Sequence, residues 1–277
     1  MNEKMNFGEI RRDISDNLKA KNLNKEREGT WGVYDSSIDS FGFSFLSCLP
    51  DSYSNEIYDK EIDFEEYGEP FRQYIWETLA KSKGDRHTAI EFGGPGSALF
   101  TSFSNKDLYR TVGVCLDDIR GSSEKGRDEE YGHSVIIGDL FDTKNEEMYK
   151  QIREKIGAVK TDLILSRMMG PLDDIAKNPI IMDRVIRKWY EMLNENGLIF
   201  VQFDYYRRFI RVDGKSTPKR INREHKSEIE DDVEEWIKKI KTKFPNEIDI
   251  QIGEGVLRLH KKEGSPETLP ALKELGS

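Results

Sequence analysis

Cysteine and long apolar runs are what this sequence most lacks. Only Cys48 and Cys115 occur among its 277 residues, and Cys115 falls in a stretch expected to be a buried strand. This argues against a disulfide scaffold and favours the reducing cytoplasm as the location of the protein. No run approaches the roughly 20 apolar residues of a membrane-spanning helix, so no membrane partner is expected. The first residues also lack the apolar core of a signal peptide.

Positive charge is in deficit as well. The chain carries 43 Lys and Arg against 52 Asp and Glu, a net charge of −9. That balance disfavours unselective binding to nucleic acid, although a local basic surface is compatible with it. No metal is predicted, because the four histidines are isolated and lack ligand spacing: His87, His133, His225 and His260. The chain is long enough to bury one good core and to carry an added cap.

The chain is organised around residues 88–97, Thr-Ala-Ile-Glu-Phe-Gly-Gly-Pro-Gly-Ser. A short apolar run ends in Glu91 and breaks into a turn with Gly93, Gly94 and Gly96, after which a helix can begin. Glycines allow a positive φ and let a ligand approach the backbone. The free N–H groups at the start of a helix attract polar or anionic ligands. A strand, glycine turn and helix build a ligand site at the carboxyl end of an open α/β sheet.

Further apolar runs follow and are predicted to be strands of the same sheet. Three of them end in polar residues, at Asp117-Asp118, at Asp139 and at Ser166-Arg167. A hairpin is predicted near the C-terminus, because two alternating segments flank Gly253-Glu254-Gly255. The predicted strands lie at residues 88–91, 111–116, 134–137, 161–165, 197–203, 248–252 and 256–259.

With these motifs in this order, the sequence resembles the class I S-adenosylmethionine-dependent methyltransferase family over about residues 85–262. The resemblance implies an α/β fold with a seven-stranded Rossmann-like sheet, parallel except for a C-terminal antiparallel hairpin. It also implies S-adenosyl-L-methionine as the cofactor and an enzyme that transfers a methyl group. Residues 1–84 are then expected to form an N-terminal helical cap, and residues 263–277 a flexible tail.

The glycine turn departs in detail from the family's commonest pattern, an acid followed by glycines at alternate positions. Glu91 and Gly93 fit that pattern, but Pro95 and Ser97 occupy the next two glycine positions. The other glycines supply flexibility one residue out of phase, so the path of the turn is expected to differ. The resemblance implies that the turn surrounds the methionine part of the cofactor. The alternative is a purely structural Gly-Pro turn.

The next two motifs are assigned by the resemblance to the nucleoside part of the cofactor. A carboxylate after the second strand would accept hydrogen bonds from both ribose hydroxyls. Asp117 is favoured and Asp118 is the other candidate, while both could instead cap the following turn. Asp139, after the third strand, would accept a hydrogen bond from the adenine amino group, and Leu140 would pack against the adenine ring.

The residues after the fourth strand, Ser166 and Arg167, are expected to line the site. Arg167 could bind a carboxylate of the substrate or cofactor through two parallel hydrogen bonds, or it could be a structural ion-pair partner. The residue patterns that mark methylation of DNA amino groups, of pyrimidine carbon 6 or of RNA 2′-hydroxyls are absent. The catalytic residue is therefore unknown, and the acceptor atom stays open.

The N-terminal region is predicted to contain two helices, separated by an aromatic, turn-rich stretch over residues 31–54 and an acidic loop over residues 56–69. Residues 7–28 show a thin apolar stripe, which indicates a helix that is either a lid over the cofactor or a simple packing helix. Phe41, Phe43 and Phe45 alternate as on a half-buried strand. A further helix is predicted to start at Pro70.

A basic segment bears on the substrate. Residues 204–226 carry eight Lys or Arg against three acids, and Tyr205 and Arg208 are its candidate substrate contacts. The segment suits an anionic acceptor or RNA if it is a substrate loop, and it only balances the acidic surface if it is a solvated insertion. The favoured function is methyl transfer to a small molecule. The alternatives are an RNA or nucleotide methyltransferase that uses this segment and a non-catalytic binding protein with the same fold. The sequence does not indicate the oligomeric state.

Overall fold

The structure, a computed structural model, describes residues 37–58, 66–82, 86–103, 108–118, 120–167, 179–203, 209–212, 215–218, 228–253 and 255–271. The helix expected over residues 7–28 and the candidate substrate residues Tyr205 and Arg208 lie outside this part of the chain. Its helices are α2 (Ile38–Phe45), the 3-10 helix η1 (Leu46–Cys48), α3 (Asp51–Tyr58), α4 (Gly68–Leu79), α5 (Ser97–Thr101), α6 (Ser122–Glu130), α7 (Glu146–Ile156), α9 (Pro179–Glu191) and α10 (Glu228–Lys243). None of these helices is long and apolar enough to cross a bilayer.

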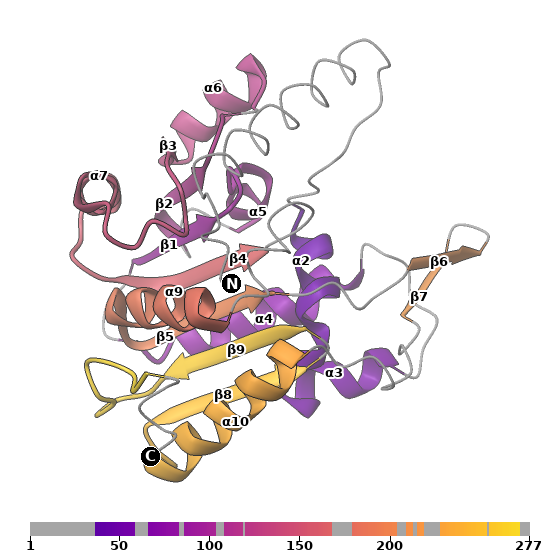
Figure 1. The fold of residues 1–277 in the computed structure, drawn as a ribbon. Coiled ribbons are helices and arrows are strands. Elements are labelled where there is room, and N and C mark those ends of the chain that lie inside the picture. Colours follow the sequence, from indigo (N-terminus) through magenta and orange to yellow (C-terminus); the bar gives the residue numbers. More distant parts are fainter. Residues whose placement is uncertain are drawn as a thin grey trace, which may run out of the picture.

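A seven-stranded sheet forms the centre of the fold (Figure 1). Its strands are β1 (His87–Phe92), β2 (Leu108–Cys115), β3 (His133–Ile137), β4 (Thr161–Arg167), β5 (Leu193–Gln202), β8 (Ile248–Gly253) and β9 (Val256–Lys261). They lie in the order β3-β2-β1-β4-β5-β9-β8. The first five are parallel, and β9 runs antiparallel to both β5 and β8. The prediction of a parallel sheet with an antiparallel C-terminal hairpin is confirmed.

The strand order places the candidate site. From β1 the chain proceeds outward to β2 and β3, and then returns to β4 on the other side of β1. The order therefore reverses between β1 and β4, and ligands of open α/β sheets bind beyond the carboxyl ends of the strands at such a reversal. A separate pair of antiparallel strands, β6 (Phe209–Val212) and β7 (Lys215–Pro218), follows β5.

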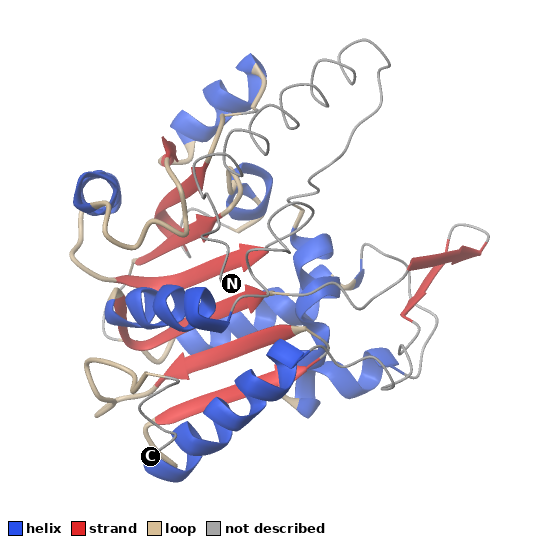
Figure 2. Ribbon diagram, in the orientation of Figure 1, coloured by secondary structure: helices blue, strands red, loops and turns tan. Residues whose placement is uncertain are grey.

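Helices cover both faces of the sheet (Figure 2). On one face, Ile90, Phe92 and neighbouring strand residues pack with α7, α9 and α10. On the other face, Ala89, Leu163 and Leu165 pack with α2, α4 and α5. Every residue of β1 and of β4 is buried, because side chains alternate between two covered faces. The helices over residues 37–82 therefore share a core with the central strands.

Helix α2 overturns one prediction from the sequence. Phe41, Phe43 and Phe45 were expected on a half-buried strand, and all three lie in α2 and are buried. The helix begins after Ser37, whose hydroxyl oxygen accepts the backbone N–H of Ser40 at 3.2 Å. A helix enclosed on most sides is apolar around most of its circumference, so the spacing of its aromatic residues cannot distinguish it from a strand.

The first part of the predicted tail is packed against the fold. Leu269 is only 3% exposed and belongs to the core on the α10 side of the sheet. The indole N–H of Trp236 donates a hydrogen bond to the carbonyl of Pro270 at 3.1 Å. A flexible tail beginning at residue 263 therefore does not fit the described residues 263–271.

A buried guanidinium joins the helical layer to the C-terminal hairpin. Arg258, on β9, donates from Nε to the Cys48 carbonyl at 2.8 Å and from one terminal nitrogen to the Tyr74 hydroxyl. The same terminal nitrogen lies 2.7 Å from a carboxylate oxygen of Asp249, and the other donates to Gln251 at 3.3 Å. Groups from η1, α4 and β8 thus share one cation.

Replacing this guanidinium should be costly. Arg258→Met keeps most of the apolar volume but leaves the Cys48 carbonyl and the partly exposed Asp249 without their donor, so we expect the free energy of unfolding to fall by about 1–3 kcal/mol. The control is Arg187→Met, which removes a partly exposed pair with Asp183 on α9 and should change stability by less than about 1 kcal/mol. Urea denaturation measures the free energy of unfolding of both variants. Equal losses would show that the buried contacts of Arg258 contribute no more to stability than a partly exposed ion pair does.

Candidate functional site

The turn after β1 folds back onto β2. The N–H of Gly93 donates to the carbonyl of Val114 at 2.8 Å. Gly93 and Gly96 have φ values of 94° and 69°, which glycine adopts without strain. A Cβ atom at Gly113 would overlap the carbonyl oxygen of Pro95, so the turn lies this close only because β2 carries a glycine there. These contacts fix the path of the turn between β1 and α5.

Gly96 is required by contacts within the chain. It precedes the first residue of α5, and a Cβ atom there would collide with the ring of Phe100 and approach His133. The positive φ adds strain for any other residue. A larger side chain at this position would therefore disturb the protein itself before it could meet a ligand.

Glu91 is a fully buried carboxyl group at the carboxyl end of β1. It is 0% exposed, and among the described residues neither side-chain oxygen makes a hydrogen bond of ordinary geometry, although the backbone N–H of Gly96 lies near the group. Burial raises the pKa of Glu91 to about 8, while the charge of Arg167 and the backbone N–H of Gly96 act in the opposite direction. The Glu91 carboxyl is therefore mostly protonated at neutral pH.

Arg167 lies under the helical layer. It is 2% exposed, donates from one terminal nitrogen to the Ser40 hydroxyl at 2.6 Å, and stacks its guanidinium 4.0 Å from the centre of the Phe41 ring. Both partners belong to α2. Of the two roles expected from the sequence, this placement favours the structural one. Ser166 is also buried, and its hydroxyl donates to the Phe92 carbonyl at 2.8 Å. It ties the end of β4 to the end of β1.

The two aspartates after β2 have different surroundings. Asp118 accepts from the Nε of Arg120 at 2.9 Å and from a terminal nitrogen at 3.0 Å, and the ammonium of Lys125 lies 3.2 Å away. Burial alone would raise the pKa of Asp118, but the hydrogen bonds from Arg120 outweigh it and lower that pKa to about 2. Both carboxylate oxygens of Asp118 thus accept hydrogen bonds from Arg120, and the neighbouring Asp117 is partly exposed.

After β3, Asp139 closes a local turn and Leu140 is buried, whereas the sequence analysis expected both to contact the adenine. Asp139 accepts the backbone N–H of Phe141 at 3.0 Å, so one carboxylate oxygen closes a local turn. Leu140 is 4% exposed and packs in the core with Ile136 and Met148, which leaves no apolar face for an adenine ring. The contact of Leu140 with an adenine ring stays a prediction, and its burial does not favour it.

Ile137, which the sequence analysis did not single out, supplies apolar surface at the same place. It is the last residue of β3 and is 59% exposed. Its signal in the sequence was its alternation with buried Ile136, which indicated that one of the two isoleucines faces away from the core. Because β1, β2, β3 and β4 are adjacent and parallel, Glu91, Asp117, Ile137 and Ser166 lie along one edge of the sheet.

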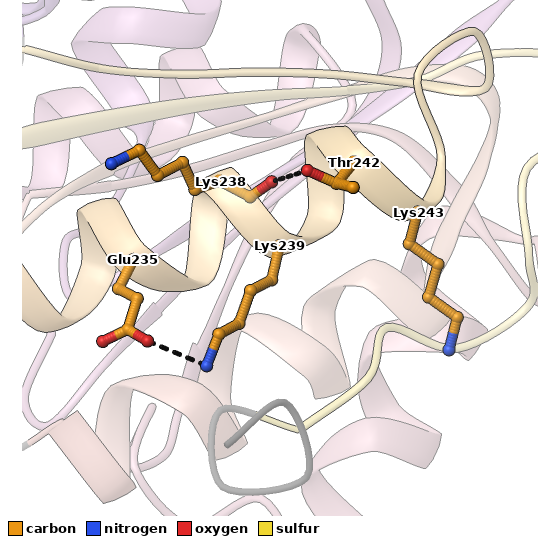
Figure 3. A pocket seen from close by; sticks show the side chains of 5 residues that line it. All are labelled: Glu235, Lys238, Lys239, Thr242 and Lys243. Carbon is orange, nitrogen blue, oxygen red and sulfur yellow. Dashed lines mark hydrogen bonds and ion pairs between the residues drawn. The ribbon is translucent and has the colours of Figure 1, made fainter. Parts of the chain in front are cut away.

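The described residues contain no group of three or more His, Cys, Asp or Glu that could hold a metal ion. A shallow hollow runs along α10, lined by Glu235, Lys238, Lys239, Thr242 and Lys243 (Figure 3). Its lining comes from one helix, and Lys239 pairs with Glu235 at 2.9 Å. Because the end of α10 leads into the amino end of β8, this hollow lies away from the carboxyl edge of β1–β4.

The buried carboxyl of Glu91 should make stability depend on pH. Since its pKa in the folded protein is about 8 and its ordinary pKa is 4.5, the folded state holds a proton that the unfolded state releases between these values. Stability is therefore lost as pH rises through this window, by up to about 1.4 kcal/mol per pH unit. Glu91→Gln should remove that slope. Glu129→Gln, an exposed change on α6, should keep it, and identical pH profiles for wild type and Glu91→Gln would refute the assignment.

No protein-family model matches the chain, and no curated protein sequence matches it. Among solved structures, it overlaps an rRNA methylase from Streptococcus thermophilus with 12% identity over 68% of this chain and 93% of that chain, at a TM-score of 0.39. It overlaps a putative methyltransferase from Streptococcus mutans with 12% identity over 69% and 97%, at 0.39. A Clostridium acetobutylicum S-adenosylmethionine-dependent methyltransferase overlaps with 14% identity over 76% and 98%, at 0.39. The fold assignment depends on the strand order itself: five parallel strands, with antiparallel β9 between β5 and β8, give the chain the fold of the class I methyltransferases.

Proposed function

We propose that the protein is an S-adenosylmethionine-dependent methyltransferase acting on a small-molecule acceptor. The observation that carries the proposal is the edge where the strand order reverses. There a glycine turn, Asp117 and Asp139 follow three adjacent parallel strands. Backbone N–H groups of a turn can donate to a polar tail, and two carboxylates can accept from hydroxyl and amino groups, a combination that suits an amino-acid-linked nucleoside.

Each part of the cofactor has candidate partners in this arrangement. Asp117 is the ribose candidate, because it is partly exposed just beyond the carboxyl end of β2, and both oxygens of Asp118 accept from Arg120. Asp139 is the adenine candidate, and its turn-closing hydrogen bond uses only one oxygen of a group that can accept several. Ile137 replaces Leu140 as the apolar surface for the ring, because it is the exposed one. The methionine part falls to the turn from Gly93 to Gly96.

S-adenosylmethionine, when bound, supplies a methyl group made electrophilic by a positive sulfur. The protein then has to orient the acceptor in line and exclude water, which needs no dedicated base. The net charge of −9 favours a small acceptor over RNA. Arg167 is buried against α2, so it supports the site by positioning that helix over the carboxyl ends of the strands.

Calorimetry with S-adenosylmethionine and S-adenosylhomocysteine tests the proposal. Micromolar binding of both is expected, whereas no binding at millimolar cofactor would leave a non-catalytic protein with a methyltransferase fold. Mass spectrometry of molecules that copurify can then name the acceptor. Salt-sensitive RNA binding that is lost in Arg207→Gln/Arg208→Gln would favour the RNA alternative instead.

The two aspartates after β2 should differ in effect. Asp117→Asn removes an acceptor pair for the ribose and should weaken cofactor binding by about tenfold to a hundredfold with little loss of stability. Asp118→Asn breaks the fork to Arg120 and should lower the melting temperature while affecting affinity less. The reverse pattern would exchange their roles.

Asp139 can be tested in two steps. Asp139→Asn keeps an oxygen that can accept the Phe141 N–H, so stability should hold while cofactor affinity falls by roughly 1.5–3 kcal/mol. Asp139→Ala should show the same loss of affinity and also lose about 1 kcal/mol of stability, because the turn is no longer closed. Intact binding in both variants would mean that the adenine lies elsewhere.

A further inference from the structure

His133 joins the glycine turn to the sheet. It is the first residue of β3 and is buried, with Nε2 2.7 Å from the Pro95 carbonyl and Nδ1 2.8 Å from the Thr111 hydroxyl. A carbonyl only accepts, so Nε2 must carry the proton. Nδ1 then accepts from Thr111. Burial lowers the pKa of His133, which favours this neutral form.

The hydrogen bond acts at the point where the turn departs from alternating glycines. The Pro95 carbonyl is pressed against Gly113 of β2, and it receives its hydrogen bond there from His133. Proline has no N–H, so the only backbone hydrogen bond that Pro95 can make is the one its carbonyl accepts. This carbonyl belongs to the planar Pro95–Gly96 peptide group, so its position also fixes the direction of the Gly96 N–H.

A second connection runs from the same turn to the loop after β2. The Ser97 hydroxyl donates to fully buried Asp128 of α6 at 2.6 Å, and Asp128 pairs with Arg120 at 2.6 Å. Arg120 in turn holds Asp118. The turn that follows β1 and the loop that follows β2 are therefore attached to the same polar cluster beside β3.

We propose that His133 is a positioning residue for the cofactor: its Nε2–H holds the Pro95 carbonyl and so sets which peptide groups of the Gly93–Gly96 turn face the ligand. This rests on the proposed function. His133 reaches the ligand only through the turn. Asp128 and Thr111 complete the arrangement, because Asp128 anchors the start of α5 and the Thr111 hydroxyl donates to Nδ1 and holds the ring in place.

Two substitutions of His133 distinguish a role in positioning the turn from a role in stability, because each keeps a nitrogen near the position of one ring nitrogen only. Glutamine places its amide nitrogen near the position of Nε2, and asparagine places its own near Nδ1. His133→Gln should keep S-adenosylhomocysteine affinity within about threefold of wild type, because it can still donate to Pro95. His133→Asn should lose about tenfold, because its shorter side chain cannot donate to the Pro95 carbonyl and one hydrogen bond that positions the turn is lost. Both variants remove a buried ring, so both melting temperatures should fall together.

The outcomes are distinct. Equal affinity of the two variants overturns the role of His133 while leaving the proposed function intact. Failure of the wild-type protein to bind S-adenosylhomocysteine overturns both. If either variant does not fold, nitrogen-15 spectra of wild-type histidine rings decide instead. We expect a buried Nε2–H tautomer whose signal moves when S-adenosylhomocysteine is added, and an Nδ1–H tautomer or an unmoved signal overturns the inference.

Discussion

The fold depends on the burial of β1 and β4 from both sides. Each residue of these strands is covered, so a polar side chain there must find a partner inside the protein or change its ionisation. Ser166 takes the first course by donating to the Phe92 carbonyl, and Glu91 takes the second through its raised pKa. Arg167 combines a hydrogen bond with an aromatic face. Burial from solvent therefore determines the protonation and the hydrogen bonds of the polar groups at the carboxyl edge of the sheet.

The same constraint explains why the helices over residues 37–82 cannot be regarded as an addition to a finished sheet. Their aromatic residues pack on the face of β4 and β5 that would otherwise be exposed, with Phe45 and Phe71 both within ring contact of Phe200. Gly42 and Gly68 allow α2 and α4 to approach closely, because a Cβ atom at either would overlap the opposite segment. The close approach of α2 and α4, the contacts of Arg167 with α2 and the aromatic cluster all belong to the same helical layer.

The sequence was informative where a single physical pattern dominates. Apolar runs located the five parallel strands, because buried parallel strands admit little else, and alternating segments around a glycine turn located the antiparallel pair β8 and β9. It failed where two patterns look alike, as in α2, whose phenylalanines alternate although the helix is enclosed. The sequence also did not show where β3 ends. The end of the strand determines which apolar side chain is exposed beyond it, and in the structure Ile137 is exposed whereas Leu140 is buried. His133 carried no signal, since one histidine among polar neighbours does not reveal that Pro95, 38 positions away, receives its hydrogen bond.

The contacts of Arg258 have a consequence for the order of events on the ribosome. Its bond to the Cys48 carbonyl spans 210 positions and its bond to Tyr74 spans 184, while Ser47 donates to the carbonyl of Gly253 over 206. The helical layer therefore leaves the ribosome long before the strands that complete its hydrogen bonds exist. Until β9 inserts between β5 and β8, the aromatic residues of the helical layer lack the hydrogen bonds that join them to the sheet, so the fold closes only after β9 has been made.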